Sequence, residues 1–231
     1  MSSIFTPRKN KYHKYKLLRS NVIGIEGLIG AGKSTAGKSL EIYLNDLDLR
    51  TKYFPEYMNT ELLNQYLSNM NKYAYMFQMF MLLKRIDIYK EAILYANNGG
   101  ISIVDRCLVG DYAFALMQYK KRLINDDDWN VYISIINQHQ TPSPDIILYL
   151  LCDPKIAFER MINRAISSEV GGYTLKYFED LELSYKETIE LLECGLCHNC
   201  DWGLKRNTKD GKLDDASCME LLDIIRDKLI N

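Results

Sequence analysis

A glycine-rich segment near the N-terminus constrains the fold of this chain more than any other feature. Residues 27–35 read GLIGAGKST, which matches the P-loop pattern G-x-x-x-x-G-K-[ST]. A short apolar run at 21–26 precedes this segment, and a stretch of helical character at 33–46 follows it. This order of strand, loop and helix is the context that the motif requires, and it predicts a nucleotide-binding α/β fold.

The residue types of the loop suit the phosphates of a nucleotide. Its glycines let backbone N–H groups approach a phosphate closely, and the following helix directs its positive N-terminus at the same anion. We expect Lys33 to reach the β- and γ-phosphates of ATP and the Ser34 hydroxyl to ligate Mg²⁺. The predicted ATP-binding residues are Gly27, Gly30, Ala31, Gly32, Lys33, Ser34 and Thr35.

Apolar runs bounded by turn residues predict further strands, and segments of helical character predict helices. The predicted strands cover residues 21–26, 50–55, 101–104 and 145–151. The predicted helices cover residues 33–46, 73–96, 154–165, 173–192 and 216–229. Strands that alternate with helices imply a parallel sheet with helices on both faces. We expect residues 21–231 to form a single domain.

Composition and charge narrow the partners of the chain. The 231 residues carry a formal net charge of −1, so we expect no nucleic-acid partner. No apolar run is long enough for a transmembrane helix, and no secretory signal is visible, so we expect no membrane partner and a cytoplasmic location. Residues 1–20 are basic and contain no acid, which predicts a flexible arm. A mitochondrial transit peptide is the alternative, although such peptides are richer in Arg and Ser.

The cysteines leave two alternatives open. Cys194, Cys197 and Cys200 have the spacing C-x-x-C-x-x-C, which permits metal ligation with Cys218 as a fourth ligand. No second C-x-x-C lies at zinc-ribbon distance, so free thiols are the other interpretation. The surrounding stretch, residues 194–215, has no clear periodicity and predicts no element.

Polar residues accompany the ends of the predicted strands. They are Glu56 after the second strand, Asp105, Arg106 and Asp111 after the third, and Arg160, Arg164 and Glu169 after the fourth. Gln78 and Arg85 lie two turns apart on the long helix and therefore share a face. Because ligands of open α/β sheets bind at the carboxyl ends of the strands, we expect these groups to converge near the P-loop.

Together these motifs resemble the deoxynucleoside kinase family over about residues 21–188. The resemblance rests on the loop IEGLIGAGKST, on Glu56, on the Phe77-Gln78 pair, on an Asp-Arg pair after the third strand and on an R-x-x-x-R segment. It implies a P-loop kinase fold with an arginine-bearing lid, and transfer of the γ-phosphoryl group of ATP to the 5′-hydroxyl of a deoxynucleoside. It also implies a homodimer.

The resemblance also implies a role for each matched residue. The catalytic residues would be Lys33, Glu56, Arg106, Arg160 and Arg164, with Glu56 as the general base. The substrate-binding residues would be Glu56, Tyr66, Phe77, Gln78, Arg85, Arg106, Asp111 and Glu169. The ligands of Mg²⁺ would be Ser34 and Asp105. In the family, a charged pair such as Arg85 and Asp111 accompanies cytosine or purine substrates, so we expect these over thymidine.

Two departures from the family pattern are visible. Tyr57 follows Glu56, where the family usually has proline. Asp105 and Cys107 flank Arg106, where the family has Glu-Arg-Ser.

Two other functions are compatible with a P-loop. Thymidylate kinases share the loop and an Asp-Arg pair, but they need an arginine after the second strand to hold the phosphate of their substrate. Here Glu56 occupies that region, and its charge would repel a phosphate. A catalytically inactive P-loop scaffold is the second alternative, against which the charged residues Lys33, Glu56 and Arg106 argue.

Overall fold

The computed structural model describes residues 21–139, 142–164, 169–191, 197–201 and 213–230. A parallel five-stranded sheet with the order β2-β3-β1-β4-β5 lies at the centre of this part of the chain. The strands are β1 (Val22–Glu26), β2 (Thr51–Phe54), β3 (Ile101–Asp105), β4 (Ile146–Leu151) and β5 (Cys197–Asp201). All residues of β1 and β3 are buried, as expected for parallel strands covered on both faces.

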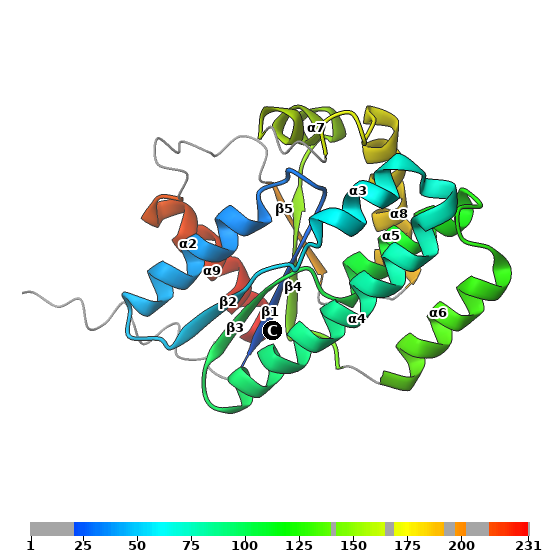
Figure 1. Cartoon of the computed structure of the whole chain (residues 1–231). Helices are drawn as coiled ribbons and strands as arrows, with labels where there is room; N and C mark the ends of the chain where they lie inside the picture. The colour runs from blue at the N-terminus through cyan, green and yellow to red at the C-terminus, as the bar shows by residue number, and fades with distance from the viewer. Residues whose placement is uncertain (1–20, 140–141, 165–168, 192–196, 202–212, 231) are drawn as a thin grey trace, which may run out of the picture.

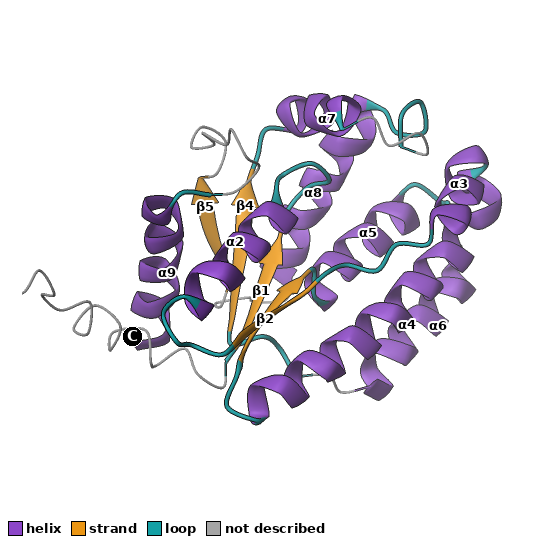
Figure 2. Cartoon of the chain, turned by 60° about the vertical axis from the view of Figure 1, so that its left-hand side comes forward, coloured by secondary structure: helices purple, strands orange, loops and turns teal. Residues whose placement is uncertain are grey.

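Helices cover both faces of the sheet (Figure 1). They are α2 (Lys33–Asn45), α3 (Thr60–Ser68), α4 (Met70–Asn97), α5 (Leu108–Lys120), α6 (Asp126–His139), α7 (Pro154–Asn163), α8 (Leu175–Leu191) and α9 (Asp215–Ile230). Helices α2 and α9 lie on one side, and α4, α5 and α8 lie on the other (Figures 1 and 2). Helix α6 adds an outer layer, because Tyr132 packs against Leu82 and Ile86 of α4.

The predicted parallel α/β architecture is confirmed, and four elements were missed. The four predicted strands appear as β1 to β4, and the predicted helices appear as α2, α4, α7, α8 and α9 with their ends shifted by a few residues. The missed elements are α3, α5, α6 and β5. Helix α5 is buried on most of its surface, so its sequence lacks an amphipathic period. Strand β5 reads CHNCD and joins the sheet edge through backbone pairing with β4.

Some of the predictions concern residues that lie wholly or partly outside the described part of the chain. The basic arm, residues 1–20, lies outside them, as do Cys194 and the side chains of Cys197 and Cys200. Cys218 is described and is buried on α9. The described residues contain no cluster of His, Cys, Asp and Glu side chains of the kind that holds a metal ion. None of the described helices is both long enough and apolar enough to cross a membrane.

The topology brings three loops to one edge of the sheet. Strand β1 pairs with β3, and β3 pairs with β2, all in parallel register. The P-loop, Glu56 and Arg106 therefore follow the carboxyl ends of three neighbouring strands. Helix α7 lies directly against the P-loop, because a Cβ added to Gly30 would stand 2.4 Å from the Ala157 carbonyl oxygen. Gly30 also has φ +77°, so glycine is needed there for both reasons.

Candidate active site

A cavity of about 260 Å³ lies at this carboxyl edge of the sheet. The P-loop, the ends of β2 and β3, and residues of α4, α5 and α8 line it. The predicted site residues among its lining are Gly30, Lys33, Ser34, Glu56, Phe77, Gln78, Arg85, Asp105, Arg106, Arg164 and Glu169. The fold therefore gathers most of the predicted nucleotide and substrate residues around one space.

Lys33 is buried at the P-loop end of this cavity. Its ammonium group donates to the carbonyl oxygens of Gly27 at 3.2 Å and Leu28 at 2.9 Å. Burial lowers the pKa of Lys33 to about 8, and the positive charge of Arg106 adds to this effect. A phosphate anion beside Lys33 would favour the protonated form and raise that pKa again.

This pKa predicts a pH dependence of ATP affinity. As the pH rises above about 8, Lys33 loses its proton in the enzyme without ATP. ATP binding must then be accompanied by the uptake of a proton. The affinity for ATP should therefore fall by up to 10-fold per pH unit. Titration calorimetry between pH 7.5 and 9.5, in buffers of different ionisation enthalpy, measures this uptake. Lys33→Arg keeps its charge throughout this range and should flatten the dependence. Equal ATP affinity and no proton uptake across the range in the wild type would contradict the assignment of Lys33.

Asp105 connects the P-loop to the end of β3. Its Oδ2 accepts hydrogen bonds from Ser34 Oγ at 2.8 Å and from the Tyr53 hydroxyl at 2.5 Å. Its Oδ1 is buried and has no hydrogen-bond partner among the described residues. Buried carboxylate oxygens are normally satisfied, so this oxygen lacks the partner that such a group usually has.

Glu56 lies between two arginines. Arg85 donates to its Oε1 at 2.5 Å, and Arg106 donates to its Oε2 at 2.9 Å. Burial raises the pKa of the Glu56 carboxyl, but the charges of Arg106 and Arg85 outweigh burial and hold that pKa below its ordinary value. Glu56 is therefore ionised at neutral pH, and each oxygen keeps a lone pair for a further hydrogen bond.

Arg106 has a backbone conformation that is uncommon for a residue with a side chain, with φ 68°. Such a left-handed conformation costs about 1–2 kcal/mol and persists only where surrounding contacts hold it. The guanidinium supplies those contacts, since Nη1 donates to the Gly27 carbonyl at 2.9 Å and to the Tyr185 hydroxyl at 2.5 Å. Together with the bond to Glu56, these contacts fix the position of the Arg106 charge.

Glu26, at the end of β1, is a buried carboxylate that was not predicted as a site residue. Its Oε1 accepts hydrogen bonds from the backbone N–H groups of Cys107 at 2.7 Å and Gly110 at 3.0 Å. The Glu26 carboxylate therefore caps the N-terminus of α5. Its Oε2 accepts from the Tyr185 hydroxyl at 2.9 Å. A side chain at position 110 would collide with it, because an added Cβ would lie 2.3 Å from Glu26 Oε2. A carboxylate within a buried run needs partners, and that was the available signal.

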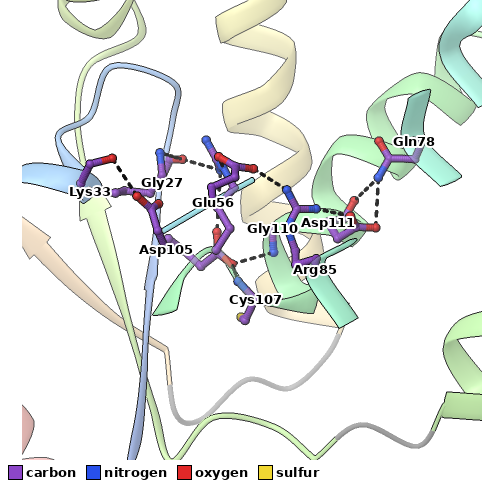
Figure 3. A network of polar contacts seen from close by, with 12 residues as sticks. Gly27, Lys33, Glu56, Gln78, Arg85, Asp105, Cys107, Gly110 and Asp111 are labelled. Atoms are coloured by element: carbon purple, nitrogen blue, oxygen red, sulfur yellow. Dashed lines mark hydrogen bonds and ion pairs between the residues drawn. The ribbon is translucent and has the colours of Figure 1, made fainter. Parts of the chain in front are cut away.

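Arg85 joins Glu56 to Asp111, a predicted substrate-binding residue that is fully buried behind Arg85 and does not itself line the cavity. Figure 3 shows its guanidinium between Glu56 on one side and Asp111 on the other. Gln78 Nε2 donates to Asp111 Oδ2 at 3.0 Å, and Gln118 Nε2 donates to Gln78 Oε1 at 2.9 Å. Gln78, Arg85 and Asp111 were predicted to lie together, and the structure places them so.

Asp111 is fully buried, so its negative charge needs hydrogen-bond and ion-pair partners for stabilisation. Burial raises the pKa of its carboxyl, while Arg85 and the Tyr132 hydroxyl act in the opposite direction. Tyr132 donates to Asp111 Oδ2 at 2.7 Å from helix α6. Neither Tyr132 nor Gln118 was predicted from the sequence, because both reach Asp111 or Gln78 from other helices.

Two more of the predicted substrate-binding residues are Glu169 and Tyr66, and only one of them lies at the cavity. Glu169 lines it and pairs with Arg164 at 2.5 Å. Tyr66, by contrast, does not line the cavity: its ring is fully buried and stacks on that of Phe77 with 4.8 Å between the ring centroids, and its hydroxyl lies 3.3 Å from that of Tyr177, so its role in substrate binding stays a prediction. Tyr173 and Tyr177, which follow Glu169 in the chain, also line the cavity.

The two predicted lid arginines are placed differently. Arg164 follows α7 and lines the cavity. Arg160 lies on α7, and its Nη1 contacts the Cys152 sulfur at 3.4 Å. Residues 165–168 lie outside the described residues, so the lid itself stays a prediction.

A family model and several curated relatives identify one family, and thymidylate kinases of Francisella tularensis match at lower identity, 26% over 191 residues. A family model described as deoxynucleoside kinase matches residues 23–209. A deoxyadenosine kinase of Dictyostelium discoideum is 31% identical over 179 residues, which cover 76% of this chain and 69% of the relative. A probable deoxycytidine kinase of fowlpox virus is 32% identical over 165 residues, covering 69% and 68%. A solved deoxyadenosine kinase from M. mycoides with bound dCTP superposes with a TM-score of 0.67 at 25% identity, covering 89% of this chain and 98% of that one.

Proposed function

The chain belongs to the deoxynucleoside kinase family, and from this premise we propose that it phosphorylates the 5′-hydroxyl of deoxynucleosides with purine or cytosine bases. Family membership establishes the reaction class, an ATP-dependent phosphoryl transfer. The observation that favours a nucleoside over a nucleoside monophosphate is Glu56, an ionised carboxylate that shares one cavity with Lys33 of the P-loop. A carboxylate there suits a neutral hydroxyl and repels a phosphate, which disfavours a nucleoside monophosphate as the substrate.

Positioning and charge carry most of the catalysis in such a transfer. Lys33 would bind the phosphates of ATP, and Arg106, held by Gly27 and Tyr185, would neutralise charge that develops on the migrating group. Arg160 and Arg164 would contribute further positive charge from the α7 side. Glu56 would accept the proton of the substrate hydroxyl through a lone pair that its arginines leave open.

The residues present fit Mg²⁺ beside the P-loop. Mg²⁺ prefers oxygen ligands, usually one or two protein groups together with waters and substrate phosphates. Ser34 Oγ and Asp105, with its buried unpartnered Oδ1, offer such oxygens. When bound, the ion would neutralise charge on the phosphate oxygens of ATP.

Base selection would come from Gln78 and Arg85, which line the cavity, and from Asp111, which is buried behind them. Gln78 offers an amide, while Arg85 and Asp111 form a buried charged pair beside it. A buried ion pair is tolerated only where each charge is partnered. A base with an exocyclic amine or a ring acceptor can complete this network, whereas the 5-methyl group of thymine would press against a charge. The deoxyadenosine, deoxycytidine and deoxyguanosine kinases among its relatives support this preference.

The preference is tested by steady-state kcat/KM for all four deoxynucleosides and for thymidylate. We expect deoxyadenosine, deoxyguanosine or deoxycytidine to exceed thymidine by at least about 10-fold, as a misplaced charge or lost polar contact implies. A wild type that prefers thymidine refutes the preference, and a wild type that prefers thymidylate refutes the substrate class.

The double variant Arg85→Met with Asp111→Ala should move the ratio towards thymidine by about 10-fold or more, because it removes both charges. Its kcat should fall for every substrate, since Arg85 also holds Glu56, so the ratio is the informative quantity. Tyr132→Phe removes one hydrogen bond to Asp111 but keeps both charges, and it should leave the ratio unchanged. An unmoved ratio in the double variant would mean that this pair does not read the base.

A homodimer is also proposed from the family resemblance. Helix α4 exposes the large apolar side chains Met76, Leu83 and Leu94, which a second copy of the chain could cover.

A further inference from the structure

Tyr53 of β2 contacts Asp105, one of the proposed Mg²⁺ ligands, from the neighbouring strand. Its ring packs where helix α2 carries Gly37, since a Cβ added to that glycine would lie 2.3 Å from the ring. This packing directs the Tyr53 hydroxyl towards the end of β3, where it donates to Asp105 Oδ2 at 2.5 Å. Tyr53 also lines the cavity.

Two hydroxyl groups bind the same oxygen of Asp105. Ser34 Oγ, at 2.8 Å, and the Tyr53 hydroxyl both donate to Oδ2. Because these donors approach from α2 and β2, they fix the rotation of the carboxylate about its Cβ–Cγ bond. The other oxygen, Oδ1, is buried without a hydrogen-bond partner in the described part of the chain. Oδ2 therefore accepts two hydrogen bonds from the protein, whereas Oδ1 accepts none from the described residues.

We propose that Tyr53 is a positioning residue for the Mg²⁺ site, which holds Asp105 by Oδ2 so that Oδ1 is presented to the ion or to a water bound to it. This inference rests on the proposed function, which assigns Ser34 and Asp105 to the metal. Groups that orient a metal-binding carboxylate by hydrogen bonding commonly contribute a factor of about 10–100 to metal affinity. Without the phenol, Ser34 alone would hold Oδ2, and the carboxylate could rotate away.

The hydroxyl can be separated from the packing of the ring. Tyr53→Phe keeps the ring beside Gly37 and removes only the donor to Asp105. We expect the dissociation constant of Mn²⁺, measured by electron paramagnetic resonance on the enzyme with saturating ADP, to rise about 10-fold. The Mg²⁺ concentration for half-maximal rate should rise in parallel, while the KM for the deoxynucleoside stays unchanged.

Tyr89→Phe is the matched control, because it removes another buried tyrosine hydroxyl, one that has no hydrogen-bond partner in the described residues and does not line the cavity. Its Mn²⁺ affinity should equal that of the wild type. Thermal unfolding of both variants checks that the fold is retained.

Asp105→Asn separates the inference from the function on which it rests. If Asp105→Asn weakens Mn²⁺ binding but Tyr53→Phe binds as the wild type does, the positioning role is overturned and the metal site stands. If Asp105→Asn also binds Mn²⁺ normally, the metal assignment fails, and the role of Tyr53 fails with it. Weaker binding in both variants, with normal binding in Tyr89→Phe, supports the inference.

Discussion

Lys33→Ala should lower kcat/KM by about 10³-fold, the largest loss we expect from a single side chain. The lysine is the charged group that the P-loop places at the β- and γ-phosphates, and one such contact in a site sheltered from water contributes about 10²–10³-fold. Its burial also keeps competing water away, which strengthens the attraction between its charge and a phosphate.

The fold should survive this change. Folding depresses the pKa of Lys33 to about 8, so the protonated side chain is less favourable in the folded protein than in the unfolded chain. Removing it should leave the unfolding midpoint unchanged or slightly higher at neutral pH. The loss of donors to the Gly27 and Leu28 carbonyls acts the other way but is small beside the buried charge.

Lys38→Ala provides a matched control on the same helix. Lys38 also borders the cavity, but its side chain is exposed, so its charge is screened by water and its removal should change kcat/KM by less than about 5-fold. If folded Lys33→Ala turns over at nearly the wild-type rate, the assignment of the P-loop to ATP is wrong.

The features that the sequence predicted are those set by local pattern and general topology. A P-loop motif fixes the order of strand, loop and helix, and the rule that ligands bind at carboxyl strand ends brings Glu56 and Arg106 to the same edge. Gln78 and Arg85 could be placed on one face because two helical turns separate them. None of these inferences required knowledge of a long-range contact.

The features that the sequence did not predict depend on such contacts. Tyr185 reaches Glu26 across 159 residues, and the N–H of Cys107 reaches it across 81. Likewise, no spacing rule indicates that Arg85 would bond Glu56 and Asp111 at once. Tyr66 was assigned by resemblance alone, and helix α3, which was missed, carries it into the core.

Replacing Glu56 with glutamine should lower kcat by about 10²-fold or more and change the KM for the deoxynucleoside far less. Glutamine keeps the size of the side chain and its ability to accept a hydrogen bond from the substrate hydroxyl, but its affinity for a proton is negligible. A general base acts as the phosphoryl group is transferred, so its loss affects kcat rather than binding.

The expected pH dependence of kcat follows from the effect of two arginines on the pKa of Glu56. Arg106 and Arg85 hold the pKa of Glu56 below its ordinary value, which is about 4.3 for a glutamate. A base with a lowered pKa is lost only when the pH falls through that lowered value. The wild-type kcat should therefore show no loss from Glu56 protonation between about pH 6 and 8, and the midpoint of any acidic limb from this group should lie below the ordinary pKa of a glutamate.

Glu56→Gln should also lower the free energy of unfolding, because Glu56 compensates the buried charges of Arg85 and Arg106. Glutamine leaves Arg85 and Arg106 without this anionic partner, and a buried hydrogen bond to a charged group is worth about 1.5–3 kcal/mol. The unfolding midpoint of Glu56→Gln should fall, so kcat must be measured at a temperature where both proteins are fully folded.

Glu56→Asp distinguishes proton transfer from charge compensation. Aspartate keeps the negative charge for Arg85 and Arg106 but withdraws the carboxylate by one methylene group. We expect it to recover most of the stability and only part of kcat, since a base must lie within hydrogen-bond reach of the proton that it accepts. If Glu56→Gln raises KM and leaves kcat intact, Glu56 is a binding residue. In that case Asp105, the other carboxylate at this end of the cavity, becomes the candidate for the proton.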